Sequence, residues 1–211
     1  AVSEAEFLAG LGFHAGLLSL GAMREEDTDA LIAHCEDVSR VIPLMGFYLQ
    51  PAVGGRLLPA AFWRRFAEIE NVVAIKIAPF NRYRTLDVIH GLVAARAEDR
   101  ITLYTGNDDH ILLDLILPFE VMRDGVPVRV RFNGGLLGHW SVWTQKAVAL
   151  FDRCRTVRLQ NSVPDDFLAL DAQVTDCNAA FFDVANEFQG CIAGCHEVLR
   201  RQGLLRGNWC L

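Results

Sequence analysis

Short apolar runs alternate along the chain with segments of helical periodicity. Runs of strand length occupy 14–20, 42–49, 72–78 and 101–105, and helical patterns occupy 4–11, 27–40, 59–70, 85–97 and 109–117. Each run is apolar throughout, which is typical of strands in a sheet covered on both faces. Strands that alternate regularly with helices predict parallel βαβ units. Ser3 and Glu6 have the spacing of a capping box for the first helix.

The pattern changes after residue 117. Residues 119–132 alternate between apolar and polar on both sides of Asp124-Gly125, which predicts an inserted β-hairpin. Residues 134–143 are expected to form a fifth central strand, and helices are expected at 144–154, 165–186 and 187–202. We therefore predict a partial (β/α) barrel over 1–155 and a C-terminal helical region over 156–211. Spacing alone also permits an open doubly wound sheet.

Composition narrows the class of protein. Apolar residues make up 52% and charged residues 22% of the 211 positions, which is a globular composition. The net charge of −6 argues against binding to nucleic acid or to an anionic membrane. No apolar run approaches the roughly 18 residues of a membrane span. The first residues lack the basic region of a signal peptide, so we expect a cytoplasmic protein.

The six cysteines form no CxxC pair. Cys191 and Cys195 share a helix face and are followed by His196, but a metal site would need more ligands nearby. Buried, reduced thiols are the expected state, and no metal is predicted.

Lys76 stands out because the chain uses arginine for nearly all its cations. The 20 basic residues include only two lysines, Lys76 and Lys146, and Lys76 lies inside the apolar run 72–78. Desolvation lowers the pKa of an ammonium group or drives it to pair with a carboxylate. A neutral lysine amine attacks carbonyl carbons. The alternative is a lysine whose head reaches solvent or forms a buried ion pair.

Two further groups lie at the carboxyl ends of neighbouring strands. Tyr48 lies near the end of the run 42–49, and Gly106-Asn107-Asp108 follows the run 101–105. Ligands in parallel α/β folds bind at the carboxyl ends of strands. A phenol beside an imine-forming lysine can relay protons. Taken alone, Tyr48 is better interpreted as a core tyrosine, and its placement together with Lys76 and 106–108 is what favours the functional interpretation.

These segments carry a family resemblance. The series 46–51 (GFYLQP), 71–76 (NVVAIK) and 103–109 (LYTGNDD) resembles the dihydrodipicolinate synthase / N-acetylneuraminate lyase superfamily. Its members are (β/α)8 TIM barrels and class I, Schiff-base lyases. Their fifth strand ends in a Tyr-Asn-x-Pro type motif, their sixth carries Gly-Ile-Lys, and their seventh ends in Gly-Asp-Asp.

The resemblance implies an aldolase or lyase that makes or breaks a C–C bond. Lys76 would form an imine with a small 2-oxo acid such as pyruvate, and Tyr48 would relay protons. Gly106 and Asp108 would line the substrate pocket. No cofactor is implied, and a homo-oligomer (tetramer or dimer) is expected.

The sequence also departs from the family pattern. Leu49 replaces the usual Asn, Ala74 replaces Gly, and Ala78 stands where sialic-acid lyases carry Thr, at the edge of the implied substrate site. His139, at the end of the expected fifth strand, is a candidate substrate contact or a packed residue. The match begins at the family's third helix, so the chain is expected to represent strands 4–8 only.

Other functions stay open at this level. A pyridoxal enzyme also uses a strand lysine, and Asp108-Asp109 could hold the metal of a class II aldolase. Arg129 and Arg131 could clamp a carboxylate or form a solvated face. From a different class, the chain could be a catalytically silent barrel relative that binds a small acid or serves in assembly.

Overall fold

The computed structural model describes residues 1–160 and 162–210, and this part of the chain divides into two compact units. Unit 1 comprises Ala1–Tyr104 and Pro118–Gly134, and unit 2 comprises Thr105–Leu117 and Gly135–Leu211. The division therefore differs from the predicted boundary near residue 155. Positions 161 and 211 of the predicted helical region lie outside the described residues.

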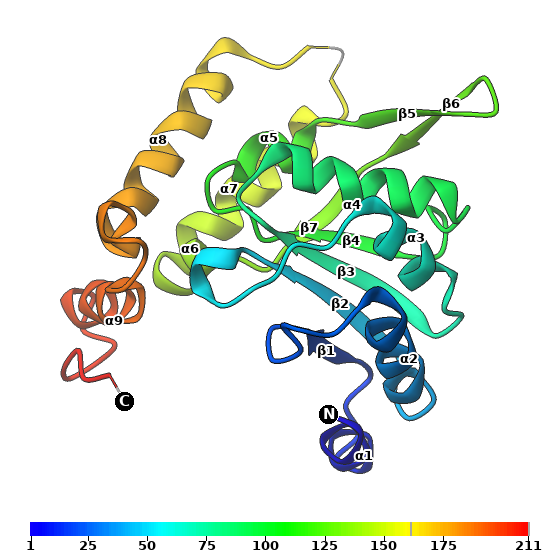
Figure 1. The fold of residues 1–211 in the computed structure, drawn as a ribbon. Coiled ribbons are helices and arrows are strands. Elements are labelled where there is room, and N and C mark those ends of the chain that lie inside the picture. The colour runs from blue at the N-terminus through cyan, green and yellow to red at the C-terminus, as the bar shows by residue number, and fades with distance from the viewer. Residues whose placement is uncertain (161, 211) are drawn as a thin grey trace. The chain divides into compact units, whose positions relative to one another are not determined.

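A five-stranded sheet organises the fold. Its strands hydrogen-bond in the order β1 (Gly16–Ser19), β2 (Leu44–Leu49), β3 (Val72–Ala78), β4 (Thr102–Thr105) and β7 (Phe132–Gly135) (Figure 1). β1 pairs with β2, and β2 with β3, in parallel. The predicted strand–helix alternation is confirmed. The predicted strand at 134–143 is wrong beyond Gly135, because residues 138–142 form a helix instead.

The helices of unit 1 include one whose predicted cap does not form. They are α1 (Val2–Gly10), α2 (Thr28–Ser39), α3 (Ala60–Glu68) and α4 (Arg82–Ala94), with a short 3-10 turn η1 (Pro51–Val53) after β2. Asp27 accepts a hydrogen bond from the Ala30 amide at 2.9 Å and so caps α2. The Ser3–Glu6 capping box does not form, because α1 starts at Val2 and Ser3 lies within it.

One face of the sheet in unit 1 packs on helices. Along β2, Leu44, Gly46 and Tyr48 are buried, whereas the alternate residues are half-buried. The buried set meets an aromatic cluster from α3, which includes Phe66. A Cβ added at Gly46 would lie 2.7 Å from Phe66 Cε1, so the missing side chain lets the ring rest on the strand. The second face of β2 is half-buried, so the predicted cover on both faces of the sheet is incomplete at this strand.

The predicted hairpin is confirmed. β5 (Phe119–Arg123) and β6 (Val126–Val130) pair antiparallel around Asp124 and Gly125, which both have positive φ values (53° and 78°). Two consecutive residues of positive φ give the turn that matches strand twist. Arg129 forms an exposed ion pair with Glu120, so this arginine belongs to a solvated face.

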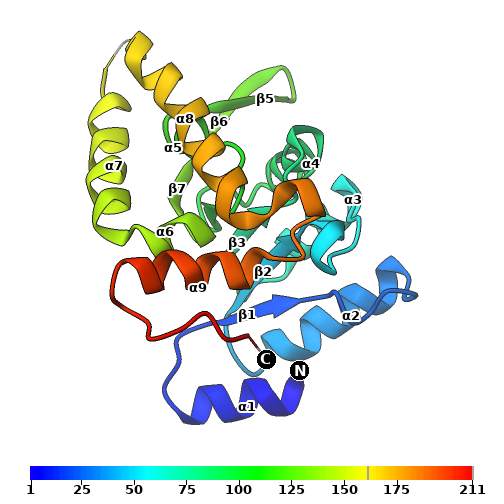
Figure 2. The ribbon, with the colours of Figure 1, turned by 90° about the vertical axis from the view of Figure 1, so that its left-hand side faces the viewer.

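Unit 2 is helical and has its own core. Its helices are α5 (Ile111–Ile116), α6 (Gly138–Val142), α7 (Thr144–Val157), α8 (Asp165–Phe182) and α9 (Cys191–Arg201), with a 3-10 turn η2 (Val184–Asn186) (Figure 2). Asp171 of α8 accepts hydrogen bonds from the amides of Leu112 and Leu113 at 3.1 and 3.2 Å, which satisfies the start of α5. α8 ends where Asp183 takes a left-handed conformation (φ 56°).

Candidate active site

Lys76 lies in β3, on the sheet face opposite the helical core of unit 1. Its strand partner in the β2–β3 register is Phe47. The Lys76 Nζ atom lies 4.4 Å from the centroid of the Phe47 ring, over the ring face. A cation in this position is attracted by the ring quadrupole. The aromatic ring therefore holds the amine on this face of the sheet.

The β2 and β3 residues that share this face with Lys76 are apolar, whereas β1 contributes Ser19, the register partner of Phe47. Alternation along β3 places Ala74 and Ala78 beside it, and both are buried. In the β2–β3 register, Met45 is opposite Ala74, and Leu49 is opposite Ala78. Ala78 thus lies on the amine side of the strand, as its predicted role at the substrate site requires.

The structure corrects the expected placement of Tyr48. This residue is paired with Ile77, so its side chain projects to the opposite face of the sheet from Lys76. The ring lies 5.2 Å from that of Trp63 in α3, and the side chain is fully buried. Its hydroxyl oxygen accepts a hydrogen bond from the Leu58 amide at 3.3 Å. Burial raises the pKa of Tyr48 above its usual value of 10.0.

Sequence reasoning missed Phe47. Adjacent residues of a strand project to opposite faces, so a shift of one position decides which aromatic residue meets the lysine. One signal in the sequence could have distinguished Phe47 from Tyr48. Small and bulky residues alternate in 44–49, and the small residue Gly46 marks the face on which the aromatic residues of helix 59–70 can pack. That signal becomes decisive only when the register between β2 and β3 is known.

In unit 2, the loop after β4 is buried and tightly hydrogen-bonded. Thr105 Oγ1 donates to Asp114 Oδ2 at 2.6 Å, and Asn107 Nδ2 donates to the same oxygen at 2.9 Å. The predicted site residue Gly106 lies between these two residues and is itself buried. Asp114, which the sequence did not single out, therefore fixes the conformation of this loop.

Asp108 and His139 lie together in unit 2. The His139 backbone amide donates to Asp108 Oδ1 at 3.0 Å. The amide group of Asn178 donates to the Asp108 carbonyl oxygen at 2.5 Å, so its own oxygen accepts from His139 Nδ1, 2.6 Å away. Burial lowers the pKa of His139, although the Asn178 hydrogen bond opposes this. His139 lies in α6, not at the end of a strand as expected.

The expected site residues thus fall in both units. Lys76 and Ala78 share one sheet face in unit 1, and Tyr48 occupies the other face. Gly106, Asp108 and His139 belong to unit 2. Substrate contact by these three residues stays a prediction, because each hydrogen bond given above is made within the protein.

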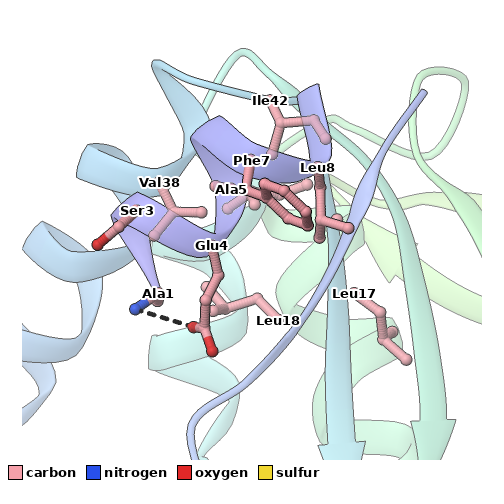
Figure 3. A pocket seen from close by; sticks show the side chains of 12 residues that line it. Ala1, Ser3, Glu4, Ala5, Phe7, Leu8, Leu17, Leu18, Val38 and Ile42 are labelled. Atoms are coloured by element: carbon pink, nitrogen blue, oxygen red, sulfur yellow. Dashed lines mark ion pairs between the residues drawn. The ribbon is translucent and has the colours of Figure 1, made fainter. Parts of the chain in front are cut away.

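An apolar hollow of about 600 Å³ in unit 1 lies between α1 and the edge strand β1 (Figure 3). Its walls include Phe7, Leu8, Leu18 and Ile42. β1 is separated from the Lys76 strand by β2, and Lys76 does not line this hollow. It therefore offers an apolar surface without the amine chemistry of β3.

The described residues form neither a metal-binding cluster nor a membrane-spanning helix. Within 1–160 and 162–210, His, Cys, Asp and Glu side chains form no group of three or more that could hold a metal ion. Over the same residues, no helix is both long enough and apolar enough to cross a lipid bilayer.

The fold is that of the dihydrodipicolinate synthase type of barrel, of which the described residues form a part. Dihydrodipicolinate synthase from Bacteroides thetaiotaomicron superposes with a TM-score of 0.75 at 15% identity, over 99% of this chain and 63% of that one. A prophage protein of the dihydrodipicolinic acid synthase family from Escherichia coli K12, solved in complex with pyruvate, gives 0.73 at 16%, over 100% and 63%. The predicted resemblance is confirmed at the level of the fold.

A third solved structure and one curated protein are also similar. A 2-keto-3-deoxygluconate aldolase variant from Sulfolobus solfataricus gives a TM-score of 0.64 at 13% identity, over 98% of this chain and 60% of that one. An L-fuculose phosphate aldolase of Escherichia coli O6:H1 (strain CFT073) is 34% identical over 98 residues, which are 45% of each chain. No protein-family model matches. The chain spans less than two thirds of the length of each of these proteins.

Proposed function

We propose that this chain carries the nucleophilic lysine of an aldolase or lyase that forms a Schiff base with a small 2-oxo acid such as pyruvate. The observation that carries the proposal is the position of Lys76, within β3 and on the sheet face opposite the helical core, where its neighbours on β2 and β3 are apolar. The fold supports it, because its structural neighbours include a 2-keto-3-deoxygluconate aldolase and a protein solved with pyruvate.

The chemistry requires the neutral form of the Lys76 amine. The Lys76 nitrogen adds to the keto carbon, the C–O bond breaks, and the oxygen leaves as water after proton transfer. The resulting protonated imine accepts the electron pair of a neighbouring C–C or C–H bond, so an enamine forms without a free carbanion. The enamine carbon then takes up a proton, or adds to the carbonyl carbon of a second substrate, which gives the protonated imine again. Addition of water to this imine and cleavage of its C–N bond return the 2-oxo acid and the free lysine.

Tyr48 has no part in this proposal. Its hydroxyl lies in the core on the other face of the sheet, where it accepts a hydrogen bond from Leu58. Asp108 and His139 stay candidates for substrate contact, and a homo-oligomer stays the expected assembly.

Reduction of the imine with borohydride tests the proposal. The chain is incubated with pyruvate and borohydride, and the modified residue is identified by intact mass and peptide mapping. The only two lysines are Lys76 and Lys146, and Lys146 is exposed on α7, which makes it an internal control for nonspecific reductive alkylation. We expect one reduced pyruvyl group, located at Lys76.

Two variants complete the experiment. Lys76→Arg keeps the charge but not the nucleophile and should abolish the adduct, whereas Lys146→Arg should leave it unchanged. If no 2-oxo acid gives an adduct at Lys76, or if both lysines react equally, the lyase function is wrong. A silent relative that binds a small acid would then account better for the fold.

A further inference from the structure

The Phe47 ring lies directly beneath the Lys76 amine. It is the register partner of Lys76, and its ring centroid lies 4.4 Å from Lys76 Nζ. The phenol of Tyr48, one residue further along, is sequestered on the opposite face. Consequently, β2 presents a hydrocarbon ring to the amine and no proton-donating group at this position.

The surface around the ring is apolar on both strands. Met45 and Leu49 flank Phe47 on its own face, and Ala74 and Ala78 flank Lys76. A molecule bound covalently to Lys76 would place the carbons next to the imine against this β2–β3 surface. Burying a methylene group is favourable by about a factor of four in affinity, whereas burying an unpaired carboxylate is strongly unfavourable.

We propose that Phe47 positions the Lys76 amine and makes the site selective for 2-oxo acids with a short apolar chain over those with a second carboxylate. This inference rests on the proposed Schiff-base function for its substrate, but the position of the ring can be tested without any substrate. Phe47 acts here as a positioning and specificity-determining residue, and it transfers no proton.

The position of the ring is tested by NMR after reductive methylation with ¹³C-formaldehyde, with Lys146→Arg assigning the two lysine signals. Nuclei over an aromatic face are shielded, so the Lys76 N-methyl signal should lie upfield of that of the exposed Lys146. Phe47→Leu should remove this displacement, and Tyr48→Phe, a matched change one residue away, should preserve it. An undisplaced wild-type signal, or one that moves in Tyr48→Phe instead, would overturn the proposed position.

Selectivity is tested by borohydride trapping at Lys76 with 2-oxobutanoate and with 2-oxoglutarate. The wild type should reach half-maximal trapping at a lower concentration of 2-oxobutanoate. The preference is expressed as the half-maximal concentration of 2-oxoglutarate divided by that of 2-oxobutanoate. Phe47→Gln, which puts an amide in place of the ring, should reduce this ratio by about fourfold or more. Phe47→Tyr retains the ring and should keep most of the preference.

The possible failures are distinguishable. If no 2-oxo acid is trapped at Lys76, the proposed function fails, and the substrate selectivity fails with it. If both acids are trapped equally well by the wild type, the function stands and the selectivity is wrong. If Phe47→Gln and Tyr48→Phe change the ratio equally, position 47 has no special role. If Phe47→Gln does not fold, the same trapping preference is measured on Phe47→Leu, which loses the aromatic ring, and on Phe47→Tyr, which keeps it.

Discussion

Tyr48→Phe separates the two positions that a Tyr48 side chain could occupy. In the core, its hydroxyl accepts a hydrogen bond from the Leu58 amide, so the substitution leaves one buried N–H without its acceptor. Loss of such a bond destabilises by about 1–3 kcal/mol, and the 3.3 Å length places the expected loss near 1 kcal/mol. For a chain of this size, that corresponds to a fall in Tm of about 2–4 °C. Trapping of pyruvate at Lys76 should be unchanged.

The assay combines urea unfolding with borohydride trapping on the same preparations. Unfolding can be followed by tryptophan fluorescence, because Trp63 contacts the Tyr48 ring.

A second readout is the dependence of the free energy of unfolding on alkaline pH. The folded-state pKa of Tyr48 is raised, so its contribution is fully present below pH 10 and is lost above it as the unfolded chain ionises first. Tyr48→Phe should therefore lose less stability above pH 10 than the wild type.

One outcome of the Tyr48→Phe experiment would refute the core position of the phenol. If Tyr48→Phe lowered the rate of trapping tenfold or more while its free energy of unfolding stayed at the wild-type value, the phenol would act at the amine. The β2–β3 register on which the site is built would then be wrong by one residue.

Three further predictions concern the core and its titrating groups. His139 has a lowered folded-state pKa, so urea unfolding should show stability falling as the pH drops below 6.5, and His139→Gln should reduce that slope. Gly46→Ala should destabilise by about 1–3 kcal/mol, because its Cβ meets the Phe66 ring; in a double-mutant cycle, Phe66→Leu should recover part of this loss. Burial raises the pKa of the Cys35 thiol to about 12, so a thiol reagent followed by mass spectrometry should label exposed Cys177 long before Cys35; equal labelling rates would contradict its burial.

Much of the architecture was readable from local patterns. Helix 27–40 and strand 72–78 were predicted within one or two residues of α2 and β3, because periodicity and β-branched content act locally. The strand predicted at 134–143 failed because a mixed apolar stretch with Gly138 fits a short helix as well as a strand. In the structure this stretch forms helix α6, and its Val142 side chain packs against Phe181 and Phe182 in the core of unit 2.

The sequence alone is enough to predict a lysine inside an apolar strand of a parallel α/β sheet, because composition and run length suffice for that. It did not determine which aromatic side chain meets the amine. Phe47 and Tyr48 are neighbours in the chain, and only the pairing of β2 with β3 assigns them to opposite faces. Likewise, the hydrogen bonds among Asp108, His139 and Asn178 join residues that are far apart in sequence. Such contacts arise from packing, so tertiary structure alone decided them.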